Sequence, residues 1–105
     1  MLIYAIEISK TASGGAWSFN TSKFDSAILK QIIVEAVNSD TTFDILLTDD
    51  HNNKPFDTSE SGETSTGKLN KEMEIPLKGI YTVACANSSL GTEVFTGRLM
   101  IMEEA

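Results

Sequence analysis

The densest group of residues that could carry chemistry lies at positions 49–54, which read Asp-Asp-His-Asn-Asn-Lys. Carboxylate and amide oxygens are the ligands that calcium prefers, and Asp44 or Asp57 could add to them. The segment nevertheless lacks the alternating acids, the central glycine and the terminal glutamate of an EF-hand loop. A solvated turn after a strand is therefore the favoured interpretation. Calcium binding at residues 49–57 is the alternative, and no metal ligand is assigned.

Nucleophilic catalysis would have to use His51, the single histidine, together with one of many serines. Because Ser and Thr are frequent in this chain, their spacing to His51 carries no information, and the sequence has no G-x-S-x-G nucleophile elbow. One histidine and the single cysteine, Cys85, cannot supply a usual zinc ligand set or an internal disulfide. We expect a protein that is not an enzyme, with no catalytic residue and no cofactor.

Two further features resemble functional motifs but have simpler interpretations. Residues 62–68, Gly-Glu-Thr-Ser-Thr-Gly-Lys, have the G-x4-G-K spacing of a phosphate-binding loop. Leu69 follows where that loop requires Ser or Thr, so a polar loop is predicted. Cys85 lies two residues after Val83, at strand spacing, which is typical of a small buried hydrophobic side chain.

Length and charge limit the classes of function. The 105 residues suffice for one domain, expected to span residues 1–105, and no apolar run approaches the roughly 20 residues of a membrane-spanning helix. The net charge of −7 argues against a nucleic-acid partner, since phosphate contacts require clustered Lys and Arg. Six of those seven charges fall in residues 40–75. The N-terminus has no basic stretch before an apolar run, so no secretory signal peptide is predicted.

Apolar residues alternate with polar ones along most of the chain, which is the pattern of half-buried strands. The alternation predicts strands at residues 2–9, 17–19, 42–48, 69–77, 80–86 and 94–102. Residues 51–68 are rich in Ser, Thr, Asn, Asp and Gly, which predicts a long loop or two loops around a short edge strand. Turns between the last strands are expected at residues 78–79 and 87–92. The pattern predicts an all-β, antiparallel β-sandwich of six to eight strands, either Ig-like or jelly-roll-like.

Residues 25–37 are ambiguous between strand and helix. Their apolar residues have helical spacing, with Asp25 or Ser26 as a cap. The β-branched run Ile32-Ile33-Val34 and the turn-like residues 38–41 favour a strand that leads by a hairpin into the next one. The strand is the favoured interpretation.

Gly79-Ile80-Tyr81-Thr82-Val83 resembles the G-x-Y-x-[C/V] segment that opens the penultimate strand of immunoglobulin-like and other β-sandwich domains. The resemblance implies that Gly79, Tyr81 and Val83 help to define the fold. It also implies that the tyrosine hydroxyl bonds back to the backbone at a corner. The chain departs from antibody domains because Val83 stands where they have cysteine, so their inter-sheet disulfide is absent.

The succession of segments resembles small virion structural proteins of tailed bacteriophages. The segments are residues 31–34 (Gln-Ile-Ile-Val), 42–50 (Thr-Phe-Asp-Ile-Leu-Leu-Thr-Asp-Asp), 69–75 and 76–83 (Pro-Leu-Lys-Gly-Ile-Tyr-Thr-Val). The resemblance implies a non-enzymatic head-decoration, neck, tail or fibre component. Such a protein is made in the host cytoplasm and incorporated into the virion, and its partners are copies of itself and other virion proteins. No residue-level functional motif accompanies the resemblance.

The last two predicted strands are apolar on both faces. The face expected in the core of a hairpin carries Tyr81, Val83, Cys85, Phe95, Leu99 and Ile101. The opposite face carries Ile80, Ala84, Ala86, Val94, Met100 and Met102. Because a solvated outer face should be mostly polar, the second set is expected to be a protein interface. The alternative is that Met100 and Met102 only cover an edge of the core.

Trp17 and Phe19 share one face of a short predicted strand. Their favoured position is one end of the core. The alternative is a carbohydrate-binding or adhesion module in which Trp17 stacks against a sugar ring.

Overall fold

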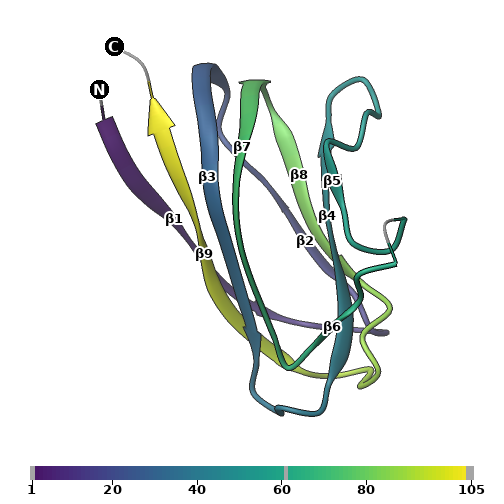
Figure 1. Ribbon diagram of the computed structural model, residues 1–105. Helices are drawn as coiled ribbons and strands as arrows, with labels where there is room; N and C mark the ends of the chain where they lie inside the picture. The colour runs from purple at the N-terminus through teal and green to yellow at the C-terminus, as the bar shows by residue number, and fades with distance from the viewer. Residues whose placement is uncertain (1, 61, 104–105) are drawn as a thin grey trace.

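A computed structural model describes residues 2–60 and 62–103 of the chain, and it is all-β (Figure 1). Two antiparallel sheets pack face to face, which confirms the predicted sandwich. Sheet one contains, in spatial order, β1 (Leu2–Thr11), β9 (Val94–Glu103), β3 (Phe24–Ala36) and β7 (Lys68–Gly79). Sheet two contains β2 (Trp17–Asn20), β8 (Tyr81–Ala86), β4 (Thr42–Asp49) and β5 (Phe56–Asp57). The two-residue β6 (Ser65–Thr66) bridges β4 and β7.

The strand order is that of a jelly roll. The last strand, β9, lies between β1 and β3, whereas in an immunoglobulin domain it would pair with the penultimate strand. The hairpins expected at residues 38–41 and 87–92 are therefore wrong, because these turns carry the chain from one sheet to the other. The turn expected at residues 78–79 is present and also joins the two sheets. Pairing is instead between strands far apart in sequence, such as β1 with β9 and β3 with β7.

The ambiguous segment is a strand, as favoured from its β-branched residues. β3 pairs with β7 on one side and β9 on the other, so it lies in the middle of sheet one. Leu29, Ile32 and Val34 are fully buried. Irregular registers after Phe24 and after Leu29 shift the alternation, which explains why the apolar spacing of this strand resembles a helix.

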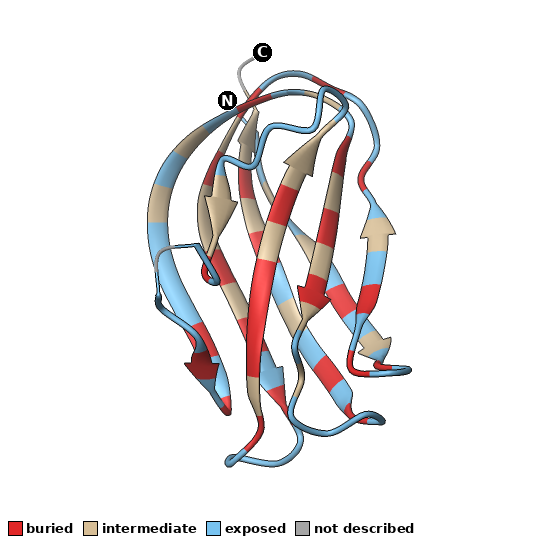
Figure 2. Ribbon diagram, turned by 90° about the vertical axis from the view of Figure 1, so that its right-hand side faces the viewer, coloured by how far each residue is buried: buried red, intermediate tan, exposed pale blue. Residues whose placement is uncertain are grey.

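Burial alternates along the strands, with buried residues facing between the sheets (Figure 2). On β9, Phe95, Leu99 and Ile101 are buried, and on β8, Val83 and Cys85 are buried, as the period-two pattern predicts. These two sets face each other across the core rather than lying side by side in one hairpin. The predicted inward faces are therefore confirmed, but their predicted pairing is wrong.

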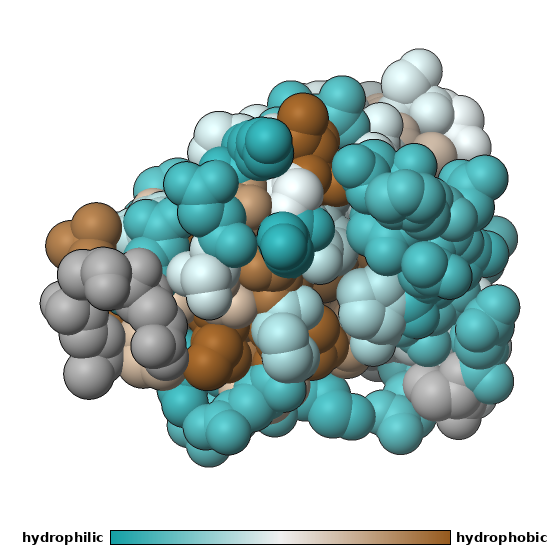
Figure 3. All heavy atoms as spheres, turned by 90° about the horizontal axis from the view of Figure 1, so that it is seen from above, coloured by the Kyte–Doolittle hydropathy of each residue, from teal (hydrophilic) through white to brown (hydrophobic). Residues whose placement is uncertain are grey.

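The described residues of the polar segment, 51–60 and 62–68, lie along the side of sheet two and contain the two shortest strands, β5 and β6. Seen from the end that carries both termini, hydrophobic atoms are interspersed on the side of β1 and β9 (Figure 3). The side of β4 and β5 is almost wholly hydrophilic (Figure 3). The acidic region identified in the sequence is thus largely a solvated flank. No helix long and apolar enough to cross a membrane occurs in residues 2–60 or 62–103.

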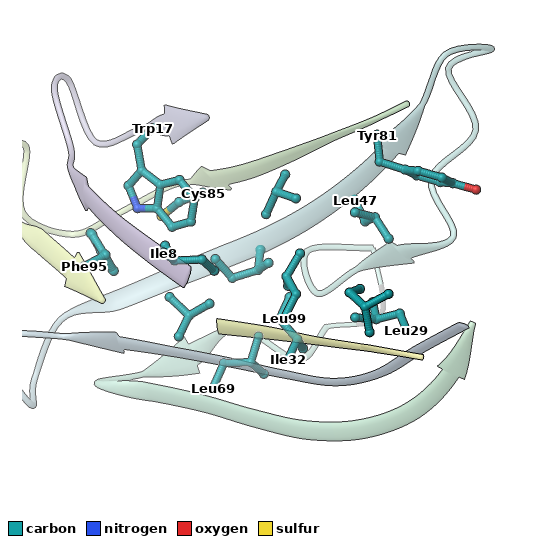
Figure 4. Packing of buried hydrophobic residues seen from close by; sticks show 14 of the residues in the cluster. Ile8, Trp17, Leu29, Ile32, Leu47, Leu69, Tyr81, Cys85, Phe95 and Leu99 are labelled. Atoms are coloured by element: carbon teal, nitrogen blue, oxygen red, sulfur yellow. The ribbon is translucent and has the colours of Figure 1, made fainter. Parts of the chain in front are cut away.

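The core is largely aliphatic in its middle and aromatic toward its ends (Figure 4). Phe43 and Phe95 meet edge to face, with ring centroids 5.1 Å apart. At the opposite end, Phe24 packs on Tyr81 at 6.2 Å. Such aromatic pairs add to the free energy gained by burying apolar surface.

Tyr81 adopts the corner geometry that the sequence resemblance implies. The backbone N–H of Lys78, three residues upstream, donates a hydrogen bond to the Tyr81 hydroxyl at 3.0 Å. Gly79 has a φ of 90°, which lets the chain leave β7 and enter the other sheet. The Tyr81 N–H is in turn bonded to the Thr21 hydroxyl at 3.1 Å. These bonds fix the passage from sheet one to sheet two.

Candidate functional site

The acidic turn after β4 is organised by its own hydrogen bonds. Asp49 Oδ1 accepts hydrogen bonds from the backbone N–H groups of His51 and Asn53, at 2.8 and 2.9 Å, and Oδ2 accepts one from the Asn53 amide at 3.2 Å. The Asn53 backbone bond is the main reason that the pKa of Asp49 lies below its ordinary value. Ligand atoms of Asp49, Asp50 and His51 lie within 4.8 Å of one another. Since both Asp49 oxygens already hold the turn, the geometry supports the solvated turn.

The two other carboxylates considered as calcium ligands differ in their surroundings. Asp44 is buried and bonded elsewhere, to Thr58, Thr64 and Asn87. Asp57 caps a local turn, where its Oδ1 accepts hydrogen bonds from the N–H and hydroxyl of Ser59.

His51 lies at the surface of the protein. Its side chain is 81% exposed, and its Nδ1 lies 2.9 Å from the Asp50 carboxylate. In the part of the chain that the structure describes, no hydroxyl is hydrogen-bonded to the imidazole. A base that activates a nucleophile requires such a contact or one through water.

The loop with G-x4-G-K spacing leads into a strand, since Lys68 begins β7. Gly67, with a φ of 74°, fits closely against the turn after β3, where an added Cβ would lie 2.4 Å from the Ser39 carbonyl oxygen. Its N–H donates to the Thr41 carbonyl at 2.7 Å. This glycine therefore closes one end of the sandwich, and the segment has no helix N-terminus to hold a phosphate.

Asp44 organises a buried polar cluster that the alternation pattern did not reveal. It lies on the outer side of β4 but is only 4% exposed. Its Oδ1 accepts hydrogen bonds from the Thr58 and Thr64 hydroxyls, at 2.9 and 2.8 Å, and Oδ2 from the Asn87 amide at 2.9 Å. Burial, the largest single influence, raises the pKa of Asp44, but the three hydrogen bonds together lower it below its ordinary value. The ionised carboxylate thus ties the segment that carries Thr58 and Thr64 to β4 of sheet two.

Glu93 has a similar role near the same end of the sandwich, where its partner Thr41 lies just before β4. It is 6% exposed, and its Oε2 accepts a hydrogen bond from the Thr41 hydroxyl at 2.8 Å. Its Oε1 accepts one from the Val94 N–H at 3.0 Å. The Thr41 bond is the main reason that the pKa of Glu93 is lowered. Glu93 ties the turn after β3 to the segment before β9, which is a structural role that the sequence analysis missed.

Cys85 is 1% exposed on the inward face of β8. Burial, with a smaller contribution from the Asp44 charge, raises the pKa of its thiol to about 12. The thiolate that a nucleophile or metal ligand requires is therefore strongly disfavoured. The prediction of a small buried hydrophobic residue is confirmed.

Trp17 lies inside the sandwich. It is 6% exposed, stacks on Phe19 with ring centroids 6.2 Å apart and packs against Phe95 at 5.9 Å. Its Nε1 has no hydrogen-bond partner in the described part of the chain. The interpretation of Trp17 as a plug at one end of the core is confirmed, and its indole ring offers no open face to a sugar.

The apolar surface expected as one interface is divided between the two sheets. Ala84 and Ala86 lie on β8, Val94, Met100 and Met102 lie on β9, and Ile80 lies between β7 and β8. The prediction of a single face is wrong because β8 pairs with β2 and β4, whereas β9 pairs with β1 and β3. The outer sides of β8 and β9 therefore point away from each other.

On sheet one, the β9 methionines belong to a larger apolar surface that the sequence pattern did not predict. Met102 lies beside Ile3 of β1 on one side and Ile28 of β3 on the other, and Ile28 lies beside Pro76 of β7. This row, Ile3–Met102–Ile28–Pro76, crosses the whole outer face of sheet one, and Ile3 is 61% exposed. Met100 and Ile3 also line a groove of about 610 Å³ on this face.

A comparison of the sequence with protein-family models and with curated proteins finds no match.

Proposed function

We propose that this protein is a non-enzymatic structural component of a virion. In this proposal it is a head-decoration, neck, tail or fibre protein that assembles with copies of itself and docks on other virion proteins. The observation that carries the proposal is the apolar row Ile3–Met102–Ile28–Pro76, which no other segment of the described chain covers. The resemblance of successive segments to small virion proteins of tailed bacteriophages is the reason for proposing that this assembly is a virion.

The charges around this row support contact with another protein. Acidic and basic side chains on the outer face of sheet one are arranged as neighbours across strands. The pairs are Glu7 with Arg98, Glu35 with Lys68, and Lys30 with Glu74. This face is thus close to neutral although the whole chain carries a net charge of −7. A neutral, partly apolar face can approach a second protein without the repulsion that an acidic face would cause.

The carbohydrate-binding alternative loses its main candidate residue, because Trp17 is enclosed in the core. The apolar residues that remain exposed on sheet one are aliphatic. Such residues favour a protein partner over a sugar ring, which is usually bound through an exposed aromatic face.

Docking can be tested with particles of a tailed phage that encodes this chain, assembled without it. Purified protein is mixed with these particles and pelleted, and the bound protein is measured. We expect the wild-type protein to sediment with the particles. Met102→Glu, which places a charge in the middle of the apolar row, should reduce binding at least tenfold.

The matched control is Ser18→Glu, which places the same charge on the exposed outer side of β2 in sheet two. This variant should bind like the wild type. Failure of the wild-type protein to bind the particles would overturn the virion role. Equal loss of binding in both variants would overturn the assignment of docking to sheet one.

A further inference from the structure

β1 is a long edge strand of sheet one. It has ten residues, and in the described part of the chain it pairs only with β9. In Figure 1, no other strand is drawn beside the upper part of β1 on the side away from β9. The free edge of a strand presents unpaired backbone N–H and C=O groups, which are a ready template for another strand.

The other edges of the sandwich are short or protected. β2 has four residues and β5 has two. β7 is long, but it carries Pro76 and five charged residues among its twelve: Lys68, Lys71, Glu72, Glu74 and Lys78. Proline and charges are the usual means by which proteins prevent edge-to-edge pairing. β1 has no proline and only two charged residues, Glu7 and Lys10, and the Lys10 ammonium lies over the Phe19 ring at 5.5 Å.

The register with β9 shows which backbone groups of β1 are available. The N–H of Ala12, just after β1, donates to the Glu93 carbonyl at 2.7 Å, in line with the β1–β9 register. Because bonding direction alternates along an antiparallel strand, even-numbered residues of β1 bond to β9. The odd-numbered residues, Ile3, Ala5, Glu7 and Ser9, therefore direct their N–H and C=O groups toward the free side.

We infer that two copies of this chain pair through β1, antiparallel and edge to edge, with Ile6 opposite Ile6 of the second copy. This pairing makes one continuous sheet from the two copies of sheet one. It also extends the apolar surface beside the edge, where Ile6 and Phe19 are half-buried and line a groove of about 420 Å³. The inference rests on the self-assembly in the proposed function and names the contact that performs it.

The sequence of β1 fits its own antiparallel copy at this register. With Ile6 at the two-fold axis, Tyr4 lies opposite Ile8, and Ala5 lies opposite Glu7. No two like charges then face each other. The four residues whose backbone N–H and C=O groups point to the free side, Ile3, Ala5, Glu7 and Ser9, then lie opposite one another in the two copies, so the hydrogen bonds between the copies can form. Centring the pair on Glu7 would place two glutamates directly opposite, which destabilises a strand pair. A pair centred on Ala5 would be shorter, because Leu2 would then lie opposite Ile8 and the paired residues of each copy would end there.

We expect a contact through one strand edge to bury less than the roughly 800 Å² per partner of a standard interface. We therefore expect a dimer that dissociates on dilution, measurable by sedimentation equilibrium of the isolated protein. Ala5→Pro removes one N–H on the free side and leaves the β1–β9 hydrogen bonds in place. It should raise the dissociation constant at least tenfold while circular dichroism stays that of the wild type.

A cross-linking experiment tests the register independently of Ala5→Pro and its folding. Ile6→Cys should form a disulfide-linked dimer on mild oxidation, because residues that face each other in a non-hydrogen-bonded pair have Cα atoms about 4.5 Å apart. The matched control is Ile75→Cys, a half-buried position on the other edge strand, β7, which should stay monomeric. Cys85 is buried and should not react.

A wild-type protein that stays monomeric at millimolar concentration would overturn the β1 dimer. So would equal cross-linking of Ile6→Cys and Ile75→Cys, or a dimer that Ala5→Pro does not weaken. These measurements use the isolated chain, so a negative result leaves the particle-binding experiment to decide the virion role. Conversely, a protein that dimerises through β1 but does not bind the particles would support this inference and overturn the virion role.

Discussion

Sheet one and sheet two differ in what lies over their outer faces. The outer face of sheet one is a regular surface of long strands, with an apolar row and paired charges open to contact. In sheet two, the outward side chain of Asp44 is covered by the segment along the β4 edge, whose Thr58 and Thr64 hydroxyls bond to its carboxylate. Sheet one depends on close backbone packing, whereas the cover of sheet two depends on an ionised side chain. The outer face of sheet one is therefore open to a partner protein, whereas part of the outer face of sheet two is buried by the chain itself.

The largest effect is expected where the backbones of sheet one approach most closely. Gly97, in the middle of β9, lies between Ile8 and Val34 of the neighbouring strands, and an added Cβ would lie 1.9 Å from the Ile33 carbonyl oxygen. Gly97→Ala must therefore separate β9 from β3. We expect it to lower the free energy of unfolding by about 3 kcal/mol or more, measured by denaturant unfolding.

Gly91→Ala is the matched control, because an added Cβ at Gly91 meets nothing within 4 Å. It should change the free energy of unfolding by less than about 0.5 kcal/mol. Equal stability of both variants would contradict the importance of close backbone packing in sheet one.

The second-largest effect is expected on the cover of sheet two. Asp44→Ala removes the acceptor for the hydroxyls of Thr58 and Thr64 and for the Asn87 amide. Loss of a buried charged acceptor with three donors should cost about 2–4 kcal/mol. Hydrogen exchange of residues 57–66 should accelerate, whereas exchange in β3 and β9 should follow only the global loss of stability.

Asp40→Ala provides the control, since Asp40 is an exposed acid in the same acidic region. It should leave both the stability and the exchange of residues 57–66 unchanged. Uniform acceleration throughout the Asp44→Ala protein, with no extra effect at residues 57–66, would show that Asp44 does not act on that segment in particular.

The contrast between the sheets also explains what the sequence could predict. Alternation is a local property, so it revealed the strands and their inward faces, including Phe95, Leu99 and Ile101. Partner strands are not a local property in a jelly roll, because most consecutive strands lie in different sheets; β4 and β5 are an exception. The hairpin of residues 80–102 was therefore wrong, and with it the single interface that included Ala84 and Met100.

The polar cluster around Asp44 escaped prediction for a related reason. Its hydrogen-bond partners Thr58, Thr64 and Asn87 lie 14, 20 and 43 residues away in sequence. Alternation placed Asp44 correctly on the outward side of β4, but an outward position normally means a solvated one. Only the path of the 57–66 segment, which no pattern of spacing specifies, turns this exposed position into a buried one. In contrast, the Tyr81 corner joins residues three apart, and it was predictable from a short motif.

Acid should weaken the contacts made by the two buried carboxylates, Asp44 and Glu93. The pKa of Asp44 in the folded protein lies below its ordinary value, as does that of Glu93. Their stabilising contribution is therefore complete above the unfolded pKa values of about 4, and it is lost as the pH falls through the folded values. The free energy of unfolding, measured from pH 7 downward, should decline below about pH 4. Protonation of Asp44 should lower the free energy of unfolding by less than Asp44→Ala does, because a protonated carboxyl keeps its volume and an acceptor oxygen.

Asp44→Asn separates this contribution from that of Glu93. The variant should be less stable than the wild type at pH 7 and should show a shallower decline in acid, since only Glu93 and the exposed acids still titrate. Hydrogen exchange at residues 57–66 in the wild type should accelerate over the same pH range once intrinsic exchange rates are subtracted. A decline of the same steepness in Asp44→Asn and wild type would contradict the dependence of this cover on the Asp44 charge.

The smallest effect is expected at the corner where the chain passes from sheet one to sheet two. Tyr81→Phe keeps the buried ring and removes only the hydroxyl that accepts the Lys78 N–H. Lys78 is exposed, so water can replace part of this bond, and the cost should be about 1 kcal/mol. Tyr81→Ala also removes the ring, which packs on Phe24, and should cost about 3–5 kcal/mol by the same unfolding measurement. Equal stability of wild type and both variants would show that this corner does not hold the two sheets together.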